Sequence, residues 1–210
     1  DLVVTTNATN NVYILHNTST PGTISLTVAQ TLTGFNNLRE VVIGDFDGDS
    51  NPDLAISNYG ANNVLFYRNT FSSTGTISFP AAASLTFTTG LSSPWGLSAG
   101  DFDGDGKVDL VVANNGSSNV SVLHNTSTGV GSISFTSTNY ITGSSPENLV
   151  LGDMNGDGKP DIAVTNNSSG TISLFQISKT SQTITITSPN VMAAGALTAT
   201  VTTTRSEERR

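Results

Sequence analysis

The 210-residue sequence contains no cysteine, which excludes a disulfide framework, a thiolate metal site and a cysteine nucleophile. Charged residues make up only 11% of the chain, a small share for a protein whose surface is built from helices. No apolar run approaches the roughly 20 residues that a membrane-spanning helix needs. The chain opens on Asp1 with neither an initiator methionine nor a signal peptide, so we expect a mature or excised piece.

Threonine, serine, asparagine and glycine are abundant, while hydrophobic residues make up 36% of the chain. This balance is typical of short β-strands joined by polar turns, and it predicts an all-β fold with a lean core.

The formal net charge of −8 argues against nucleic acid and anionic membranes as partners. Its distribution is more informative, because every aspartate lies in a repeated loop or in register with one. Three bound divalent ions would bring the formal charge to about −2, so the acidity indicates metal sites rather than a cationic partner. The twelve aspartates are Asp1, Asp45, Asp47, Asp49, Asp53, Asp101, Asp103, Asp105, Asp109, Asp153, Asp157 and Asp161.

A nine-residue aspartate-rich segment occurs three times, with starts 56 and 52 residues apart. This period lies among those of propellers and solenoids. The first loop (45–53) reads Asp-Phe-Asp-Gly-Asp-Ser-Asn-Pro-Asp, the second loop (101–109) Asp-Phe-Asp-Gly-Asp-Gly-Lys-Val-Asp, and the third loop (153–161) Asp-Met-Asn-Gly-Asp-Gly-Lys-Pro-Asp.

Each loop is followed by an apolar run, a turn rich in Asn, Ser or Gly, and a second apolar run, which predicts a β-hairpin. A Gly-Thr/Ser-Ile-Ser-Leu/Phe segment comes next, at residues 22–26, 75–79 and 131–135, and then a strand leading into the next loop. Counting this segment as a strand gives about four short strands per repeat, the content of a propeller blade. Asp1-Leu-Val-Val matches the same phase, so Asp1 stands where a loop ends.

The loop pattern indicates calcium. Carboxylates at positions 1, 3 and 5 of a tight loop converge, because glycine at positions 4 and 6 allows the positive φ that the curl needs. Position 7 (Asn51, Lys107, Lys159) would contribute its carbonyl, and position 9 the closing acid. An EF-hand is excluded, because its twelfth position is acidic, whereas here a strand residue (Ile56, Val112, Val164) stands there.

A single such loop is also compatible with a solvated Asp/Gly turn, but three copies in phase favour metal binding. The second loop has every feature. The third has neutral Asn155 at position 3, and the first has Ser50 at the position-6 glycine, which costs on the order of 1 kcal/mol if φ is positive. We expect the second loop to bind calcium most tightly.

The Asp-Phe-Asp-Gly-Asp-Gly-Lys-x-Asp-Leu string, its spacing and the glycine before it resemble the FG-GAP/VCBS repeats of integrin α-chain propellers and of many secreted bacterial proteins. The likeness covers residues 1–177 and implies β-propeller blades, calcium loops that brace one face, and an extracellular or cell-surface location. The implied ligands are Asp45, Asp47, Asp49, the Asn51 carbonyl and Asp53; Asp101, Asp103, Asp105, the Lys107 carbonyl and Asp109; and Asp153, Asn155, Asp157, the Lys159 carbonyl and Asp161, with Asp1 part of a truncated site.

The repeats are expected at residues 1–52, 53–108 and 109–160, with a half-repeat at 161–177. Residues 178–210 are expected to form a C-terminal β extension, or the start of an immunoglobulin-like module, with a charged tail. Three and a half repeats are fewer than a closed propeller needs, so the chain is either a fragment or associates head to tail with other copies. Light scattering of the isolated chain tests the second reading, which a stable monomer would contradict.

A catalytic centre is not indicated. His16 and His124 stand 15 residues after a final loop aspartate, where the other repeats have Arg68 and Gln176, and we expect surface positions without a carboxylate beside them. Trp95 could stack on a sugar, but its place before a strand favours packing. Asn-x-Ser/Thr triplets, frequent by chance in this composition, are candidate glycosylation sites at Asn7, Asn17, Asn115, Asn119, Asn125, Asn166 and Asn167.

These patterns predict a non-enzymatic, extracellular calcium-binding module for adhesion, display or assembly, with itself, surface proteins or glycans as partners. Two alternatives stay open: an accessory, carbohydrate-binding region of a larger secreted enzyme, and a self-assembling filament subunit.

Overall fold

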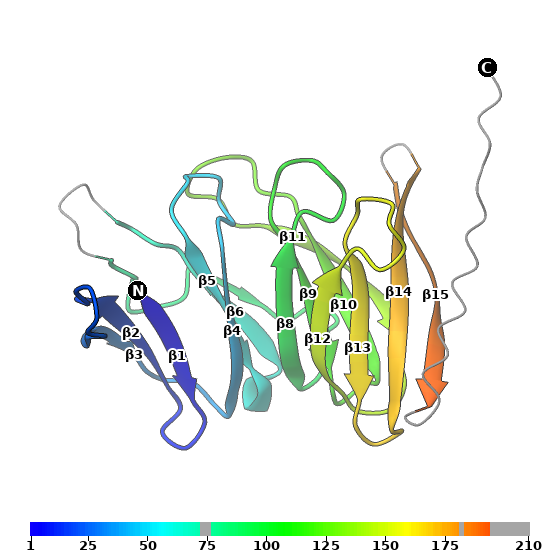
Figure 1. The fold of residues 1–210 in the computed structure, drawn as a ribbon, viewed down its shortest axis with the longest axis horizontal. Coiled ribbons are helices and arrows are strands. Elements are labelled where there is room, and N and C mark those ends of the chain that lie inside the picture. The colour runs from blue at the N-terminus through cyan, green and yellow to red at the C-terminus, as the bar shows by residue number, and fades with distance from the viewer. Residues whose placement is uncertain (72–76, 181–182, 194–210) are drawn as a thin grey trace.

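The computed structural model describes residues 1–71, 77–180 and 183–193, and shows four antiparallel sheets arranged one after another along the molecule (Figure 1). Within each sheet the strands neighbour one another in chain order. The predicted all-β class and blade-like sheets are confirmed, and the described strands form separate sheets rather than one closed sheet. The described residues contain no helix long and apolar enough to cross a membrane.

The first sheet has three strands and the other three have four. They are β1 (Leu2–Thr6), β2 (Asn11–Asn17) and β3 (Leu26–Leu32); β4 (Leu38–Gly44), β5 (Asp53–Asn58), β6 (Asn63–Tyr67) and β7 (Leu85–Phe87); β8 (Pro94–Gly100), β9 (Asp109–Asn114), β10 (Asn119–Asn125) and β11 (Phe135–Ile141); β12 (Pro146–Gly152), β13 (Asp161–Asn166), β14 (Thr171–Thr180) and β15 (Thr183–Ala193). A 3-10 turn, Tyr59–Ala61, joins β5 to β6.

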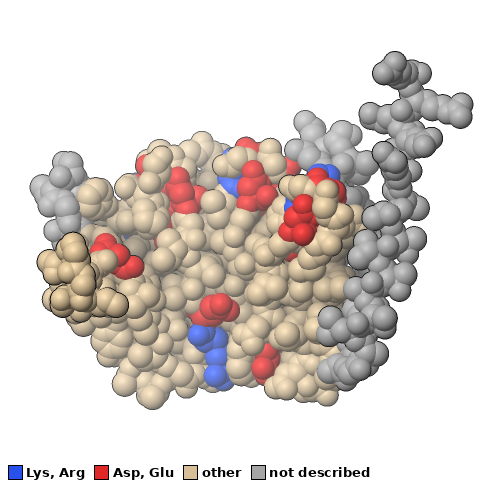
Figure 2. All heavy atoms as spheres, in the orientation of Figure 1, with Lys and Arg blue, Asp and Glu red and all other residues tan. Residues whose placement is uncertain are grey.

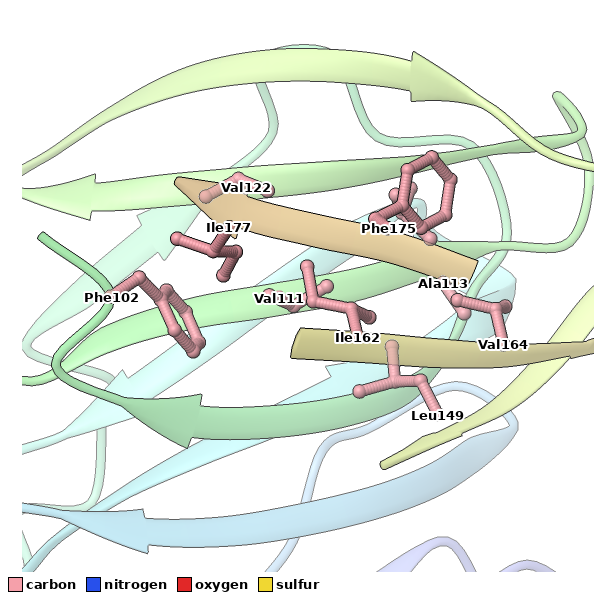
Figure 3. Packing of buried hydrophobic residues seen from close by; sticks show 10 residues of the cluster. Phe102, Val111, Ala113, Val122, Leu149, Ile162, Val164, Phe175 and Ile177 are labelled. Carbon is pink, nitrogen blue, oxygen red and sulfur yellow. The ribbon is translucent and has the colours of Figure 1, made fainter. Parts of the chain in front are cut away.

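The second strands β5 and β9 are buried along their whole length, which explains why their sequences are nearly continuous apolar runs rather than alternating ones. The core is divided into three clusters between successive sheets, so the second and third sheets pack against a neighbouring sheet on both faces. Figure 3 shows the cluster between the third and fourth sheets, where Phe102, Val111 and Ala113 face Ile162, Val164 and Phe175. Stacking of repeats therefore supplies the core that no single sheet could form alone.

Loop position 2 contributes to these clusters. Phe46 and Phe102 are 0% and 3% exposed and lie in the clusters with the following sheet. Met154, at the same position of the third loop, is 43% exposed. The burial of position 2 therefore depends on the sheet that follows.

The first strand of each four-stranded sheet has an irregularity at the same place, with register shifts between Leu38 and Val41, Pro94 and Leu97, and Pro146 and Leu149. Neighbouring first strands meet at these bulges. A Cβ added to Gly96 of β8 would lie 2.2 Å from the Glu147 carbonyl oxygen of β12. Only glycine allows the two backbones to approach so closely.

The outer strands correct one expectation. The Gly-Thr/Ser-Ile-Ser-Leu/Phe segment is not itself the strand; β3 and β11 begin at its last residue, and β7 begins several residues later. In the described residues the segment folds back on the chain beside it, with Thr70 N–H donating to Ser78 O at 2.8 Å and Thr126 N–H to Ser134 O at 2.8 Å. These bonds close a loop that leads from the third to the outer strand.

Strand β15 pairs antiparallel with β14 and forms the outer strand of the fourth sheet. The possible strand from Leu197 and the charged tail from Arg205 lie outside the described residues.

Glu40 provides a prediction about pH. Its Oε2 accepts a hydrogen bond from Leu97 N–H at 2.9 Å, across the second and third sheets. Burial raises the pKa of this carboxyl above its ordinary value, although the Leu97 bond opposes the rise. The neutral form is thus favoured in the fold, so this group stabilises the protein at low pH and the contribution is lost as pH rises through the raised pKa.

In Glu40→Gln the amide oxygen can still accept from Leu97 N–H and no charge is buried. Relative to wild type, the variant should gain stability as pH rises from about 4 to 7, measured by urea unfolding in calcium-free buffer. A stability difference that stays constant over this range would contradict the assignment.

Candidate metal centre

The three aspartate loops join the first and second strands of the second, third and fourth sheets. Because the sheets are similarly oriented, the loops lie along one edge of the molecule, and acidic residues gather along that edge in Figure 2. Each loop has the same internal hydrogen bonds, so its shape is set locally by its own side chains.

Position 1 organises the loop by accepting from three backbone N–H groups. In the second loop Asp101 Oδ1 accepts from Gly104 N–H at 2.6 Å and Asp105 N–H at 3.2 Å, and Oδ2 accepts from Gly106 N–H at 3.0 Å. The same three bonds occur at Asp45 and Asp153. Hydrogen bonds from Gly158 and its neighbours lower the pKa of Asp153, as expected of a carboxylate held by amides.

At positions 3 and 5, one side-chain oxygen accepts a hydrogen bond from the backbone N–H two residues later. Asp103 Oδ1 accepts from Asp105 N–H at 2.9 Å, and Asp105 Oδ1 accepts from Lys107 N–H at 2.9 Å. The equivalent bonds form in the first and third loops, where Asn155 keeps the position-3 acceptor. The second oxygen of each carboxylate therefore takes no bond from its own loop backbone in the described residues.

Backbone conformation agrees with the predicted turn chemistry. The position-4 and position-6 residues of the second and third loops have φ between 73° and 86°. Ser50, at position 6 of the first loop, also has a positive φ of 69°, which confirms the conformation expected for a non-glycine residue there. The loop shape is thus retained at some cost in strain.

Position 9 anchors the loop to the sheet. Asp109 is 1% exposed; its Oδ2 accepts from Phe102 N–H at 3.0 Å and its Oδ1 from Asn125 N–H at 2.8 Å. Asp53 and Asp161 accept the equivalent pairs of bonds. The closing acid thus ties the loop to the third strand of its sheet, a role beyond the ligand role expected from the sequence.

Burial raises the pKa of Asp53 to about 6, with the nearby charges of Asp47 and Asp49 adding to the rise and the bonds from Asn69 and Phe46 opposing it. The rise in this pKa therefore comes mainly from burial, and the Asp47 and Asp49 charges contribute less to it.

Asp1 occupies the position-9 place of the first sheet. Its Oδ1 accepts from Asn17 N–H at 2.7 Å, the counterpart of the bond from Asn125 to Asp109. His16 Nδ1 lies 2.9 Å from the same oxygen.

The residue 15 positions after the final aspartate faces the loop, which the sequence argument missed. His124 Nδ1 lies 3.3 Å from Asp103 Oδ2 and 3.6 Å from Asp109 Oδ1, and the nearby Asp109 carboxylate raises the pKa of His124. The prediction that His16 and His124 have no carboxylate beside them is therefore wrong. The shared spacing, already visible in the sequence, was the signal, because it places this residue on the strand beside position 9.

Donor oxygens lie close together in the first and second loops, which have an aspartate at each of positions 1, 3, 5 and 9. Ligand atoms of Asp101, Asp103 and Asp105 lie within 4.8 Å of one another, as do those of Asp45, Asp47 and Asp53. The third loop has the same fold with Asn155 in place of one carboxylate. Carboxylate, amide and carbonyl oxygens form the hard donor set that calcium prefers, and the second and third loops fit it. The first loop differs, because the Arg68 guanidinium contacts Asp47 and Asp49.

The glycosylation candidates separate by burial. Asn125 and Asn166 are 5% and 1% exposed, and their side-chain amides donate to buried or half-buried groups. A glycan on either amide would require the side chain to leave the fold, which corrects the prediction for these two. Of the others, Asn7, Asn17 and Asn167 are exposed, and Asn115 and Asn119 are half-buried.

Trp95 packs at the opposite end of the sheets from the loops. The Arg39 guanidinium carbon lies 3.9 Å from its ring centroid, and Tyr59 meets it edge-on at 5.5 Å. Through these contacts the indole packs between β4 and β8.

Comparison with known proteins concerns the repeat and the fold. The model of the FG-GAP-like repeat matches residues 45–112 and 101–164. No curated protein matches the sequence. The crystal structure of BBS1N in complex with ARL6DN, soaked with lead, is similar at 13% identity and a TM-score of 0.57, over 91% of this chain and 52% of that one. Virginiamycin B lyase from Staphylococcus aureus is similar at 15% identity and a TM-score of 0.44, over 89% and 54%. The chain thus spans about half the length of these structures.

Proposed function

Because the chain belongs to the FG-GAP-like repeat family, we propose that it is a calcium-binding structural module in which bound ions brace the loops between the first and second strands of its sheets. One observation carries the proposal: the loop backbone uses one oxygen of each aspartate at positions 3 and 5 and leaves the other free of it. An oxygen set held in this way is pre-organised for a hard cation.

In the second loop the ion would be held by Asp101, Asp103, Asp105, the Lys107 carbonyl and Asp109. In the third it would be held by Asp153, Asn155, Asp157, the Lys159 carbonyl and Asp161. When bound, calcium offsets the mutual repulsion of these carboxylates and links positions 1 to 7 to the buried position 9. The second loop, with one more carboxylate, is expected to bind more tightly.

The proposed role is mechanical rather than catalytic. The described loop carboxylates are engaged with backbone amides, and His124 is directed at these carboxylates rather than at a hydroxyl or thiol nucleophile. A calcium-braced stack of sheets suits display or adhesion at the cell exterior, where calcium is abundant enough to fill loops of moderate affinity. Surface proteins, glycans or further copies of the chain are the proposed partners.

Calcium removal tests the proposal. Ions that bind only the folded state stabilise it by mass action, by about 2.7 kcal/mol when calcium is at 100 times its Kd. Thermal unfolding should therefore occur several degrees higher in calcium than in EDTA, and magnesium at the same concentration should restore less of the difference, because it prefers a tighter octahedral shell. An unfolding temperature that is the same in calcium and EDTA would overturn the metal assignment.

A further inference from the structure

Arg68 extends from the end of the second sheet's third strand into the first loop. Its Nε donates to Asp47 Oδ2, and its Nη2 lies 3.4 Å from Asp49 Oδ2. The side chains of Asp47 and Asp49 are 0% and 9% exposed and that of Arg68 is 30% exposed, so the carboxylates are shielded from water while the guanidinium stays partly open to it. The guanidinium therefore contacts those oxygens of positions 3 and 5 that the loop backbone leaves free.

The equivalent residues leave the other loops more open. His124 Nδ1 lies 3.3 Å from Asp103 Oδ2 and 3.6 Å from Asp109 Oδ1 of the second loop, but the charge of an imidazole depends on pH. Gln176, at the same position of the third repeat, carries no charge and is exposed. Among the residues at this position of the three full repeats, Arg68 is the one with a permanent charge; in the second loop the Lys107 ammonium lies 3.6 Å from Asp105 Oδ2, but both of those side chains are exposed to water.

The next repeat covers the first loop as well. Gly131 N–H, from the connection between β10 and β11, donates to Asp47 Oδ2 at 2.8 Å. Ser127 Oγ and Asn125 Nδ2 donate to the Phe46 carbonyl at 3.1 and 3.0 Å. With the bond from Asp49 N–H, Asp47 accepts from three donors, which nearly fills the capacity of a carboxylate.

We propose that Arg68 is a built-in cation that takes the place of calcium in the first loop, so that the chain binds two calcium ions rather than three. This inference rests on the proposed calcium binding of the second and third loops. A guanidinium offers a planar set of donors to two carboxylates at once and remains protonated at any physiological pH. The stability of the contact between the second and third sheets is then independent of calcium, while the stability of the second and third loops depends on it.

The experiment counts calcium ions by isothermal titration calorimetry in the wild-type chain and in Arg68→Gln, which introduces the residue type found at this position of the third repeat. We expect two ions in the wild type and three in the variant, because the freed Asp47 and Asp49 oxygens regain a metal-binding geometry. His124→Gln is the matched control and should keep two ions.

Three ions in the wild type, or two in Arg68→Gln, would overturn the role of Arg68 and leave the calcium proposal standing. No binding in either protein would overturn the proposed function and this inference together.

A second pair of variants applies if Arg68→Gln does not fold. Asp49→Asn and Asp105→Asn remove the same charge at position 5 of the first and second loops, and the asparagine oxygen can keep the backbone bond two residues on. The rise in unfolding temperature on adding calcium should be unchanged in Asp49→Asn and reduced in Asp105→Asn. Equal reductions in both would contradict the inference.

Discussion

Replacing Gly96 with alanine is expected to lower the free energy of unfolding by about 3 kcal/mol, which shifts the unfolding temperature down by roughly 6–12 °C. The added Cβ would lie 2.2 Å from the Glu147 carbonyl oxygen and 3.2 Å from the Asn148 Cα. Both obstacles are backbone atoms of β12, so no change of side-chain rotamer relieves the clash. The third and fourth sheets must move apart, which also loosens the core around Leu149 and Val111.

Gly152→Ala is the matched control, since Gly152 ends the neighbouring first strand and a Cβ there would meet nothing within 4 Å. Chemical denaturation of both variants should show a large loss for Gly96→Ala and almost none for Gly152→Ala. Similar losses in the two would show that the close approach of β8 and β12 is not what makes glycine necessary.

The second large effect is expected from Asp109→Asn. The two Asp109 oxygens accept from Phe102 N–H and Asn125 N–H, and an asparagine has only one oxygen. One buried amide therefore loses its acceptor and faces the new NH2 group, at a cost of about 1–3 kcal/mol. This loss should appear in EDTA as well as in calcium, because it concerns the attachment of the loop to the sheet.

Asp105→Asn separates this anchoring role from the metal role. Asp105 is exposed, and its bond from Lys107 N–H can be kept by the asparagine oxygen. Thermal unfolding should therefore be unchanged in EDTA and lowered in calcium for Asp105→Asn, but lowered in both conditions for Asp109→Asn. If Asp109→Asn behaved like wild type in EDTA, the anchoring role of position 9 would be incorrect.

Local features of the fold could be predicted from the sequence because they arise from neighbouring residues. The hairpin after each final aspartate and the curl of the loop depend on turn chemistry within a few positions. Even the strained Ser50 could be predicted, because repeat alignment identifies its position as one that needs positive φ. The same periodicity indicated blade-like sheets, since a repeat of this length cannot bury its strands alone.

Contacts between repeats could not be predicted in this way. The closeness of Gly96 to Glu147 depends on bulges that bring two first strands together, and bulges have no clear sequence signature here. The sequence shows that Arg68 and His124 occupy equivalent positions of their repeats, but it does not show that they contact the loop carboxylates. That contact depends on the twist of the third strand, which decides whether its end faces the loop. The repeat content predicts a strand at residues 131–135, but β11 begins only at Phe135, and Gly131 N–H donates to Asp47 of the first loop instead.

The most direct test of the calcium account is a crystal structure grown in calcium, with anomalous scattering data that identify the ion. The account predicts peaks in the second and third loops, each surrounded by oxygens at about 2.3–2.6 Å. In the second loop these oxygens would come from Asp101, Asp103, Asp105 and the Lys107 carbonyl, and the first loop would hold the Arg68 guanidinium without a peak. Calcium-saturated crystals with no anomalous peak in the second and third loops would contradict it.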